Sequence, residues 1–284
     1  MTCEKLIRTF NRLVLSLVLL SFASCTLEQK LAQTFVDNGI KEDFLLMEPG
    51  YVFKYNLKTY EIPGLDTMNE YLKDSVLVSR SLFLKDVSDS LFLFSFTSGF
   101  QNQMKAYGIS IYPENYLDTF MASGRKALVI NLAQFSLEEY VHPYSSDEAV
   151  DEEIVTIDDI DLNALNYNIW LELSLMNAEG SRKVFFASDF LMDNLEGVLM
   201  QYLFSGDMRY DYTIDTISMS QVYGFASKFG KEVAGYLYDY FLNTYIGNEL
   251  PPGYQFERYY YHYDPEKRRI YPVDPAESLM ELAR

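Results

Sequence analysis

Residues that commonly carry enzyme chemistry are scarce in this chain of 284 residues. It contains two cysteines, two histidines and one tryptophan. With only His142 and His262 available, a histidine-rich metal site is impossible, and a Ser-His-Asp triad would have to use one of them. Neither is predicted to be catalytic, because His142 precedes Pro143 in an expected loop and His262 lies between two tyrosines in an expected hairpin strand. HExxH, CxxC and GxSxG motifs are absent, which leaves carboxylates as the main enzymatic option.

Positive charge is also scarce. The chain has 23 Lys and Arg residues against 41 Asp and Glu residues, for a net charge of −18. A body this acidic repels phosphate backbones, and no basic stripe is evident, so nucleic acid is not an expected partner. The composition, 49% hydrophobic and 16% aromatic, is otherwise typical of a globular fold.

The first 25 residues have the pattern of a bacterial secretion signal. Lys5, Arg8 and Arg12 form a positive start, and Leu13 to Phe22 form an apolar core. At ten residues this core is half of the ~20 that a helix needs to span a bilayer. We therefore predict a signal segment and not a membrane span.

The end of this segment, Phe22-Ala23-Ser24-Cys25, resembles the bacterial lipobox, in which an aliphatic residue, two small residues and a cysteine direct lipid attachment. The resemblance implies cleavage before Cys25, so that residues 1–24 are removed and Cys25 carries diacylglycerol. Cys3 would leave with the signal, and no free thiol would remain for disulfides, metal binding or catalysis. The alternative is an ordinary secretory signal that is cleaved near a cysteine.

The residues after the cysteine indicate the outer membrane and not the inner membrane. Thr26 stands where an Asp would resemble the inner-membrane retention signal, and Leu27 to Lys30 lack the acidic run of some surface-exported lipoproteins. The two or three acyl chains expected on such a cysteine hold a protein stably in a bilayer. We predict the periplasmic leaflet of the outer membrane of a diderm bacterium, with residues 25–40 as lipidated cysteine and tether. Leu27 to Asp37 is expected to be a short polar helix or a tether. Because the removed segment has a net charge of +2, the mature chain would carry −20.

Hydrophobic spacing predicts a single α/β or α+β domain over residues 41–284, with a mixed sheet, helices packed on one face and a long C-terminal packing helix. Ser218 with Gln221 forms a capping-box pattern at the start of that long helix. A type I turn at Asp264 to Lys267 predicts a terminal hairpin near residues 255–273. Strands are expected at Phe44–Met47, Ile109–Tyr112, Lys126–Tyr140, Leu162–Met176, Val184–Ser188, Val198–Phe204 and Met208–Ile214, and helices at Thr67–Leu84, Ser88–Tyr107, Asn115–Ala122 and Met219–Ile246.

The segment from Ser145 to Asp161 contains eight carboxylates and no Lys or Arg, which predicts a flexible acidic loop. Oxygen-bearing side chains alternate from Asp159 to Asn163, as calcium ligands do. The EF-hand pattern nevertheless breaks, because Ala164 replaces the required glycine and Trp170 replaces the bidentate Glu. No metal site is predicted.

Two other segments superficially match catalytic motifs. Gly224 to Glu232 has two glycines and a lysine, but its spacing is wrong for a phosphate-binding loop and it lies inside a predicted helix. Ser123 to Lys126 matches a Ser-x-x-Lys pattern without the companion motifs of the serine penicillin-binding enzymes. Neither segment is assigned a catalytic role.

Ten tyrosines crowd the C-terminal part of the chain. Tyrosine can stack on sugars or anchor a protein contact, but alternation along strands favours core and cross-strand packing here. Glycan binding usually uses exposed tryptophan, and the chain has only Trp170. The tyrosines are Tyr236, Tyr238, Tyr240, Tyr245, Tyr254, Tyr259, Tyr260, Tyr261, Tyr263 and Tyr271.

The order of elements from Phe44 to Ile246, behind a lipobox, is similar to that of auxiliary lipoproteins of ABC-type envelope transport systems and of amino-terminal domains of TolB-like proteins. The resemblance implies a non-catalytic periplasmic partner of a transport or assembly machine. Cys25 is then the single predicted functional residue, with no cofactor, and the partners are the membrane and an envelope complex. A surface glycan-binding lipoprotein, or a carboxylate-based hydrolase, is the alternative.

Overall fold

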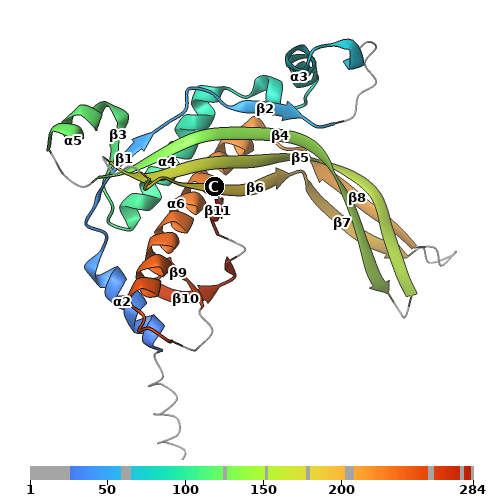
Figure 1. Ribbon diagram of the computed structural model, residues 1–284. Coiled ribbons are helices and arrows are strands. Elements are labelled where there is room, and N and C mark those ends of the chain that lie inside the picture. The colour runs from blue at the N-terminus through green and yellow to red at the C-terminus, as the bar shows by residue number, and fades with distance from the viewer. Residues whose placement is uncertain are drawn as a thin grey trace, which may run out of the picture. The chain divides into compact units, whose positions relative to one another are not determined.

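The computed structural model describes residues 26–58, 65–123, 127–150, 153–176, 180–201, 208–254, 259–275 and 278–282. Where the sequence predicted one domain, the chain divides into two compact units. The small unit comprises Met1–Ile40 and Tyr238–Pro275, and the sheet unit comprises Lys41–Leu237 and Ala276–Arg284. The fold is α+β, and the predicted mixed sheet, long C-terminal helix and terminal hairpin are confirmed (Figure 1).

The sheet unit is built on seven strands in the order β11-β6-β5-β4-β1-β3, with β2 paired to another part of β4. β1 runs parallel to β3 and β4, and β2 runs parallel to β4, whereas the pairs among β4, β5, β6 and β11 are antiparallel. The strands are β1 Asp43–Met47, β2 Phe53–Asn56, β3 Ile111–Pro113, β4 Ala127–Val150, β5 Glu153–Leu175, β6 Lys183–Met192 and β11 Met280–Leu282.

Two helices of this unit pack on one face of the sheet, as predicted. They are α4 Asp89–Ala106 and the part of α6 Met219–Glu249 that ends at Leu237. Phe96 of α4 contacts Phe135 of β4, with ring centroids 4.6 Å apart, and Phe225 of α6 contacts Tyr167 of β5 at 4.8 Å. Phe135 and Tyr167 point to the same side of the sheet, because Tyr167 pairs with Leu137, two residues beyond Phe135. The unit also contains α3 Glu70–Ser79, α5 Leu117–Ser123 and short 3₁₀ turns at Leu65–Thr67, Leu84–Asp86 and Glu114–Tyr116.

The two helices approach each other closely at two glycines. A Cβ atom added to Gly99 of α4 would overlap the carbonyl oxygen of Ser227, and one added to Gly230 of α6 would overlap that of Phe96. Both helices depend on the missing side chains at these positions, so Gly230 has a packing role and belongs to no phosphate-binding loop.

The prediction of a flexible acidic loop at Ser145 to Asp161 is wrong for the described residues. β4 and β5 continue as a paired hairpin through this segment, from Leu128 opposite Leu175 to Val150 opposite Glu153. The β-branched residues at Ile154 to Ile157 favour strand, and backbone pairing outweighs the charge of the side chains. His142 likewise lies within β4 and not in a loop.

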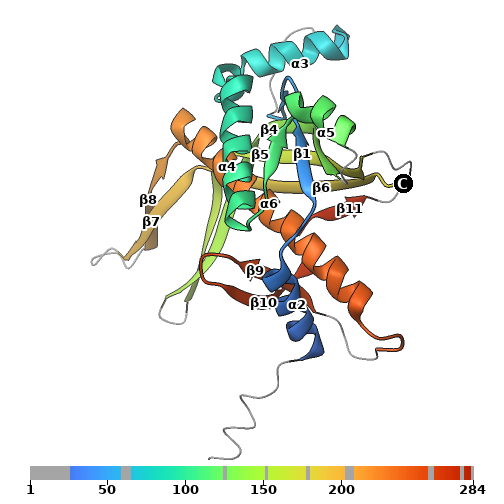
Figure 2. The ribbon, with the colours of Figure 1, turned by 90° about the vertical axis from the view of Figure 1, so that its left-hand side faces the viewer.

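A separate ribbon, β7 Asn194–Gln201 with β8 Met208–Asp215, confirms the second predicted hairpin. It lies beside the far part of β4 and β5 in both views (Figures 1 and 2). Ile160 and Leu162 of β5 are buried there, with Leu195 and Tyr210 of the ribbon packed against them.

The small unit contains α2 Leu27–Asn38, the end of α6 from Tyr238, and the hairpin β9 Tyr260–Asp264 with β10 Arg269–Val273. Its core is formed by four buried residues, Ala32, Leu242, Ile246 and Tyr261. Of the helix or tether expected after Cys25, the helix is the one observed. None of the helices in the described part of the chain is long and apolar enough to cross a membrane.

Candidate functional site

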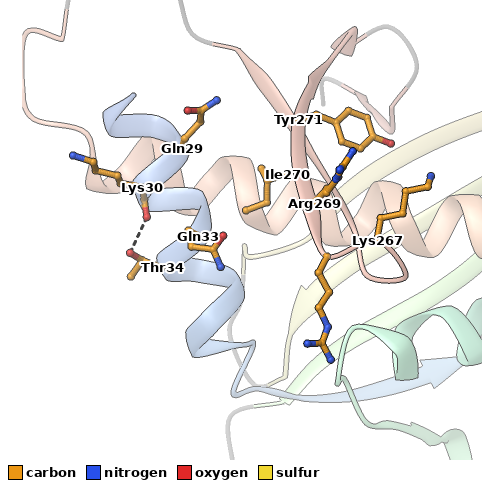
Figure 3. Close-up of a pocket in the computed structure, with 9 residues that line it drawn as sticks. Gln29, Lys30, Gln33, Thr34, Lys267, Arg269, Ile270 and Tyr271 are labelled. Carbon is orange, nitrogen blue, oxygen red and sulfur yellow. Dashed lines mark hydrogen bonds between the residues drawn. The ribbon is translucent and has the colours of Figure 1, made fainter. Parts of the chain in front are cut away.

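The small unit contains a surface groove of about 1060 Å³ between α2 and the turn that leads into β10 (Figure 3). α2 lines it with Gln29, Lys30, Gln33 and Thr34, and the hairpin lines it with Lys267 to Tyr271. Four of these residues are basic and none is acidic. In a chain with a net charge of −18, this is the feature that we take as the candidate site.

The start of α2 is fixed by a capping box. Thr26 is the N-cap, and its Oγ1 accepts a hydrogen bond of 3.2 Å from the backbone N–H of Gln29. The side-chain oxygen of Gln29 accepts one of 3.2 Å from the N–H of Thr26. The N-cap of α2 therefore follows Cys25 directly in the sequence, and Gln29 both closes the cap and lines the groove.

The buried side of α2 holds it in place within the small unit. Ala32 is fully buried, and the Oε2 of Glu28, a residue only 2% exposed, accepts a hydrogen bond of 3.1 Å from the Tyr261 hydroxyl. With that side fixed, Gln33 lies on the side of α2 nearer the hairpin, whereas Lys30 and Thr34 line the groove from its outer edge, on the far side of the helix (Figure 3). The Thr34 hydroxyl donates to the backbone oxygen of Lys30 at 2.8 Å.

The opposite wall comes from the predicted turn between β9 and β10. The Oδ1 of Asp264 accepts hydrogen bonds of 3.0 Å from the N–H groups of Glu266 and Lys267. The Lys267 ammonium lies 2.9 Å from Oδ2 of Asp264, and its hydrogen bond holds the pKa of that carboxyl below its ordinary value. Arg268 has a φ of 50°, and among the described non-glycine residues no other adopts a positive φ. This turn places Lys267, Arg268 and Arg269 in succession along the groove.

The four cations of the groove differ in their ion pairing. Lys30, Arg268 and Arg269 have no carboxylate partner among the residues that the structure describes, whereas Lys267 shares its charge with Asp264. Guanidinium groups, ammonium groups and side-chain amides are the donors that bind phosphate and carboxylate oxygens. The groove can therefore bind an anion.

A part-buried pair of His262 and Asp239 joins the hairpin to α6. His262 Nδ1 lies 2.6 Å from Oδ2 of Asp239, whose Oδ1 accepts 3.1 Å from the N–H of Tyr263. This hydrogen bond raises the pKa of His262 above its ordinary value, whereas burial raises the pKa of Asp239. The His262 ring also meets Tyr271 of the groove edge-on at 5.2 Å. Within the described residues no Ser or Thr hydroxyl bonds to His262.

The tyrosines divide between core and surface. Tyr238 and Tyr261 are each 1% exposed, which confirms core packing for them, whereas Tyr259 and Tyr271 are 59% and 40% exposed. Trp170 is half-buried against Phe186, with ring centroids 5.0 Å apart.

The other candidate positions from the sequence form no site where the structure describes them. His142 stacks on Phe190 at 6.1 Å, and Gly224 to Glu232 lies inside α6 as expected. Residues 124–126 of the Ser-x-x-Lys segment lie outside the described residues, as does Cys25. No group of three or more His, Cys, Asp or Glu side chains in the described ranges could hold a metal ion.

Sequence reasoning missed the basic groove. The signal was the run Lys267-Arg268-Arg269, which the predicted turn already placed on the surface. Its pairing with α2 could not be foreseen, because more than two hundred residues separate the two walls. No protein-family model matches this chain, and no curated protein matches it either.

Proposed function

We propose that this chain is a lipoprotein of the outer membrane, anchored by lipid on Cys25, and that it serves as a non-catalytic periplasmic accessory or scaffold in envelope transport or assembly. The observation that carries the proposal is the direct succession of Cys25 and a packed helix. Thr26 is the N-cap of α2, and α2 is held by Glu28 and Ala32 in the small unit.

This succession favours a protein that stays close to the membrane surface over one that extends away from it on a flexible linker. A lipidated cysteine followed by a flexible linker lets a domain move freely above the bilayer. Here Cys25 is joined by a single peptide bond to Thr26, the N-cap of α2. The lipid would therefore hold the small unit at the membrane surface with little slack, as a scaffold requires.

The anchor is tested by two serine substitutions in the full-length gene. Cys25→Ser should abolish incorporation of labelled palmitate and release the protein from the membrane fraction. Cys3→Ser is the matched control, because this residue lies in the predicted signal, and it should remain labelled and membrane-bound. A Cys25→Ser protein that still incorporated palmitate would overturn the proposal.

The partner is tested by affinity purification from detergent-solubilised envelopes. A scaffold should recover membrane machinery reproducibly, and repeated recovery of this protein alone would contradict that role.

Protease treatment of intact cells tests the leaflet, because a periplasmic protein is degraded only after the outer membrane is broken. Cleavage on intact cells would favour the surface glycan-binding alternative, for which the exposed Tyr259 and Tyr271 of the C-terminal tyrosine group are candidate stacking groups.

A further inference from the structure

The basic residues of the small unit are distributed unevenly. Lys30, Lys267, Arg268 and Arg269 are its only Lys and Arg residues within the described ranges, and all four line the groove. The chain as a whole has nearly twice as many acidic as basic residues. A local excess of cations on an acidic protein points to an anionic partner at that place.

The groove lies next to the proposed lipid attachment. Gln29 lines the groove and hydrogen-bonds to Thr26, which is covalently joined to Cys25. Lys30 follows Thr26 by four residues, about 6 Å along the axis of α2. If Cys25 carries lipid, the phosphate-bearing surface of the bilayer is the nearest source of anions.

The lining has the chemistry of a membrane interface. Arg268 and Arg269 can each bind a phosphate through two parallel N–H groups, and Lys30 adds a compact positive charge. Tyr271 and Ile270 add a half-exposed aromatic ring and an aliphatic side chain, and tyrosines of this kind gather at membrane–water interfaces.

The backbone conformation of Arg268 also indicates a binding role for this residue. Its φ of 50° lies in the left-handed region that favours glycine, and an arginine stands there nonetheless. The strained position extends the basic run by one residue at the edge of the groove. A charge that is kept at a conformational cost fits a binding role.

We infer that the groove binds the phosphates of anionic phospholipid headgroups in the membrane that holds Cys25, and that this contact fixes the orientation of the small unit on the bilayer. The inference rests on the proposed lipid anchor. Each basic residue near an anionic surface increases the bound population by about fivefold. The three unpaired cations together correspond to about 100-fold, enough to fix the orientation of a protein that its lipid already holds at the surface.

The test uses the purified lipidated protein in vesicles of phosphatidylcholine, with and without phosphatidylglycerol. Acetylation of lysine amines is followed by mass spectrometry. Lys30 and Lys267 should react about fivefold more slowly in the phosphatidylglycerol vesicles, and high salt should remove the protection. Lys105 and Lys231, which are exposed in the sheet unit, are internal references and should react equally in both. Equal reaction of Lys30 in the two vesicle types would overturn the inference.

Substitutions distinguish binding at the groove from a general effect of the protein's positive charges. Arg268→Gly and Arg269→Gln should each reduce the protection of Lys30, whereas Lys105→Gln should leave it unchanged. Circular dichroism should confirm that the variants are folded, and Arg268→Gly suits the backbone of the turn. Protection of Lys30 that survived both groove substitutions would contradict the inference.

Two further arms identify other occupants. Inorganic phosphate is added to phosphatidylcholine vesicles, and protection equal to that by phosphatidylglycerol would assign the groove to a soluble phosphate ligand and overturn the inference. Protection that appeared in phosphatidylcholine only at high protein density would assign the groove to a second copy of the chain and would also overturn the inference.

Palmitate labelling is measured on the same sample. An unlabelled protein contradicts the proposed function, whereas a labelled protein without protection contradicts the headgroup contact alone.

Discussion

His262 Nδ1 and Asp239 Oδ2 lie 2.6 Å apart, and the Asp239 side chain is only 3% exposed. The pair joins β9 to α6 within the small unit, and the N–H of Tyr263 donates to the other oxygen of the same carboxylate. Both oxygens of this buried carboxylate accept hydrogen bonds, and one of the donors is the His262 ring. The strength of the link between β9 and α6 therefore depends on whether the imidazole is charged. Asp264 and Lys267 are the other charged groups that influence His262, the first raising and the second lowering its pKa.

The stability of the small unit should therefore fall as the pH rises through the neutral range. The pKa of His262 is raised in the folded protein, so the stabilisation is fully present below the unfolded value of about 6.5 and is lost as the pH passes the folded value. Urea unfolding at about pH 6 and pH 8 should show this loss, and His262→Phe should remove most of the difference. At the lower pH the substitution should cost about 2 kcal/mol. A wild-type stability that rose over this interval would contradict the assignment.

Gly230 and Gly224 of α6 should respond oppositely to alanine. Gly230→Ala should destabilise the sheet unit by about 3 kcal/mol, because the new Cβ overlaps the carbonyl oxygen of Phe96 in α4. Gly224→Ala should stabilise it by about 0.5 to 1 kcal/mol, because no atom lies within 4 Å of the added Cβ and alanine favours helix. Thermal unfolding of the two variants tests the close approach of the helices, and equal effects would refute it.

The sequence predicted those parts of the fold in which residues close together in the chain also contact each other in the structure. Alternation predicted the hairpin of β5 and β6, and the Ser218–Gln221 capping box is present, with Ser218 N donating to Gln221 Oε1 at 2.8 Å. The acidic segment was misjudged because its charge was weighted above its β-branched residues. The groove was missed because its walls, α2 and the Lys267–Tyr271 segment, are far apart in the sequence, and no periodicity reports such a pairing.

Glu139 should be the most sensitive carboxylate of the sheet unit. It is fully buried and accepts hydrogen bonds from the backbone N–H groups of Leu82 to Leu84 at 2.7 to 3.3 Å, while Lys58 Nζ lies 2.8 Å away. Glu139→Gln replaces an acceptor by a donor that faces other donors, and it should cost about 3 kcal/mol. Glu138→Gln at the partly exposed neighbouring position should cost less than about 1 kcal/mol. Chemical denaturation compares the two, and similar losses would argue against this role for Glu139.

Arg268→Gly should stabilise the small unit although it removes a side chain. The φ of 50° costs an L-residue about 1 kcal/mol, and glycine adopts it without a steric penalty. We expect a gain of about 0.5 to 1 kcal/mol in unfolding free energy, reduced by the larger backbone entropy of glycine in the unfolded chain. Arg268→Ala is the control, since it removes the same charge but keeps the strain, and it should give no gain. Equal gains for both variants would indicate that relief of charge, and not of strain, is responsible.

The contact between Glu28 and Tyr261 should determine whether α2 stays folded next to Cys25. The Tyr261 hydroxyl donates to the buried carboxylate at 3.1 Å, so Tyr261→Phe should cost about 2 kcal/mol by removing a donor to a charged acceptor. In a double-mutant cycle with Glu28→Leu, the two losses should fall short of additivity by about 1 kcal/mol or more. Hydrogen exchange of the α2 amides gives the local readout, because loosening of this contact should expose the helix before the sheet unit unfolds. Strictly additive losses, with α2 amides as protected as in the wild type, would show that other contacts hold the helix in place. Failure of this contact should also convert α2 into a flexible tether, and the proposed lipid anchor on Cys25 would then not fix the orientation that we infer for the groove.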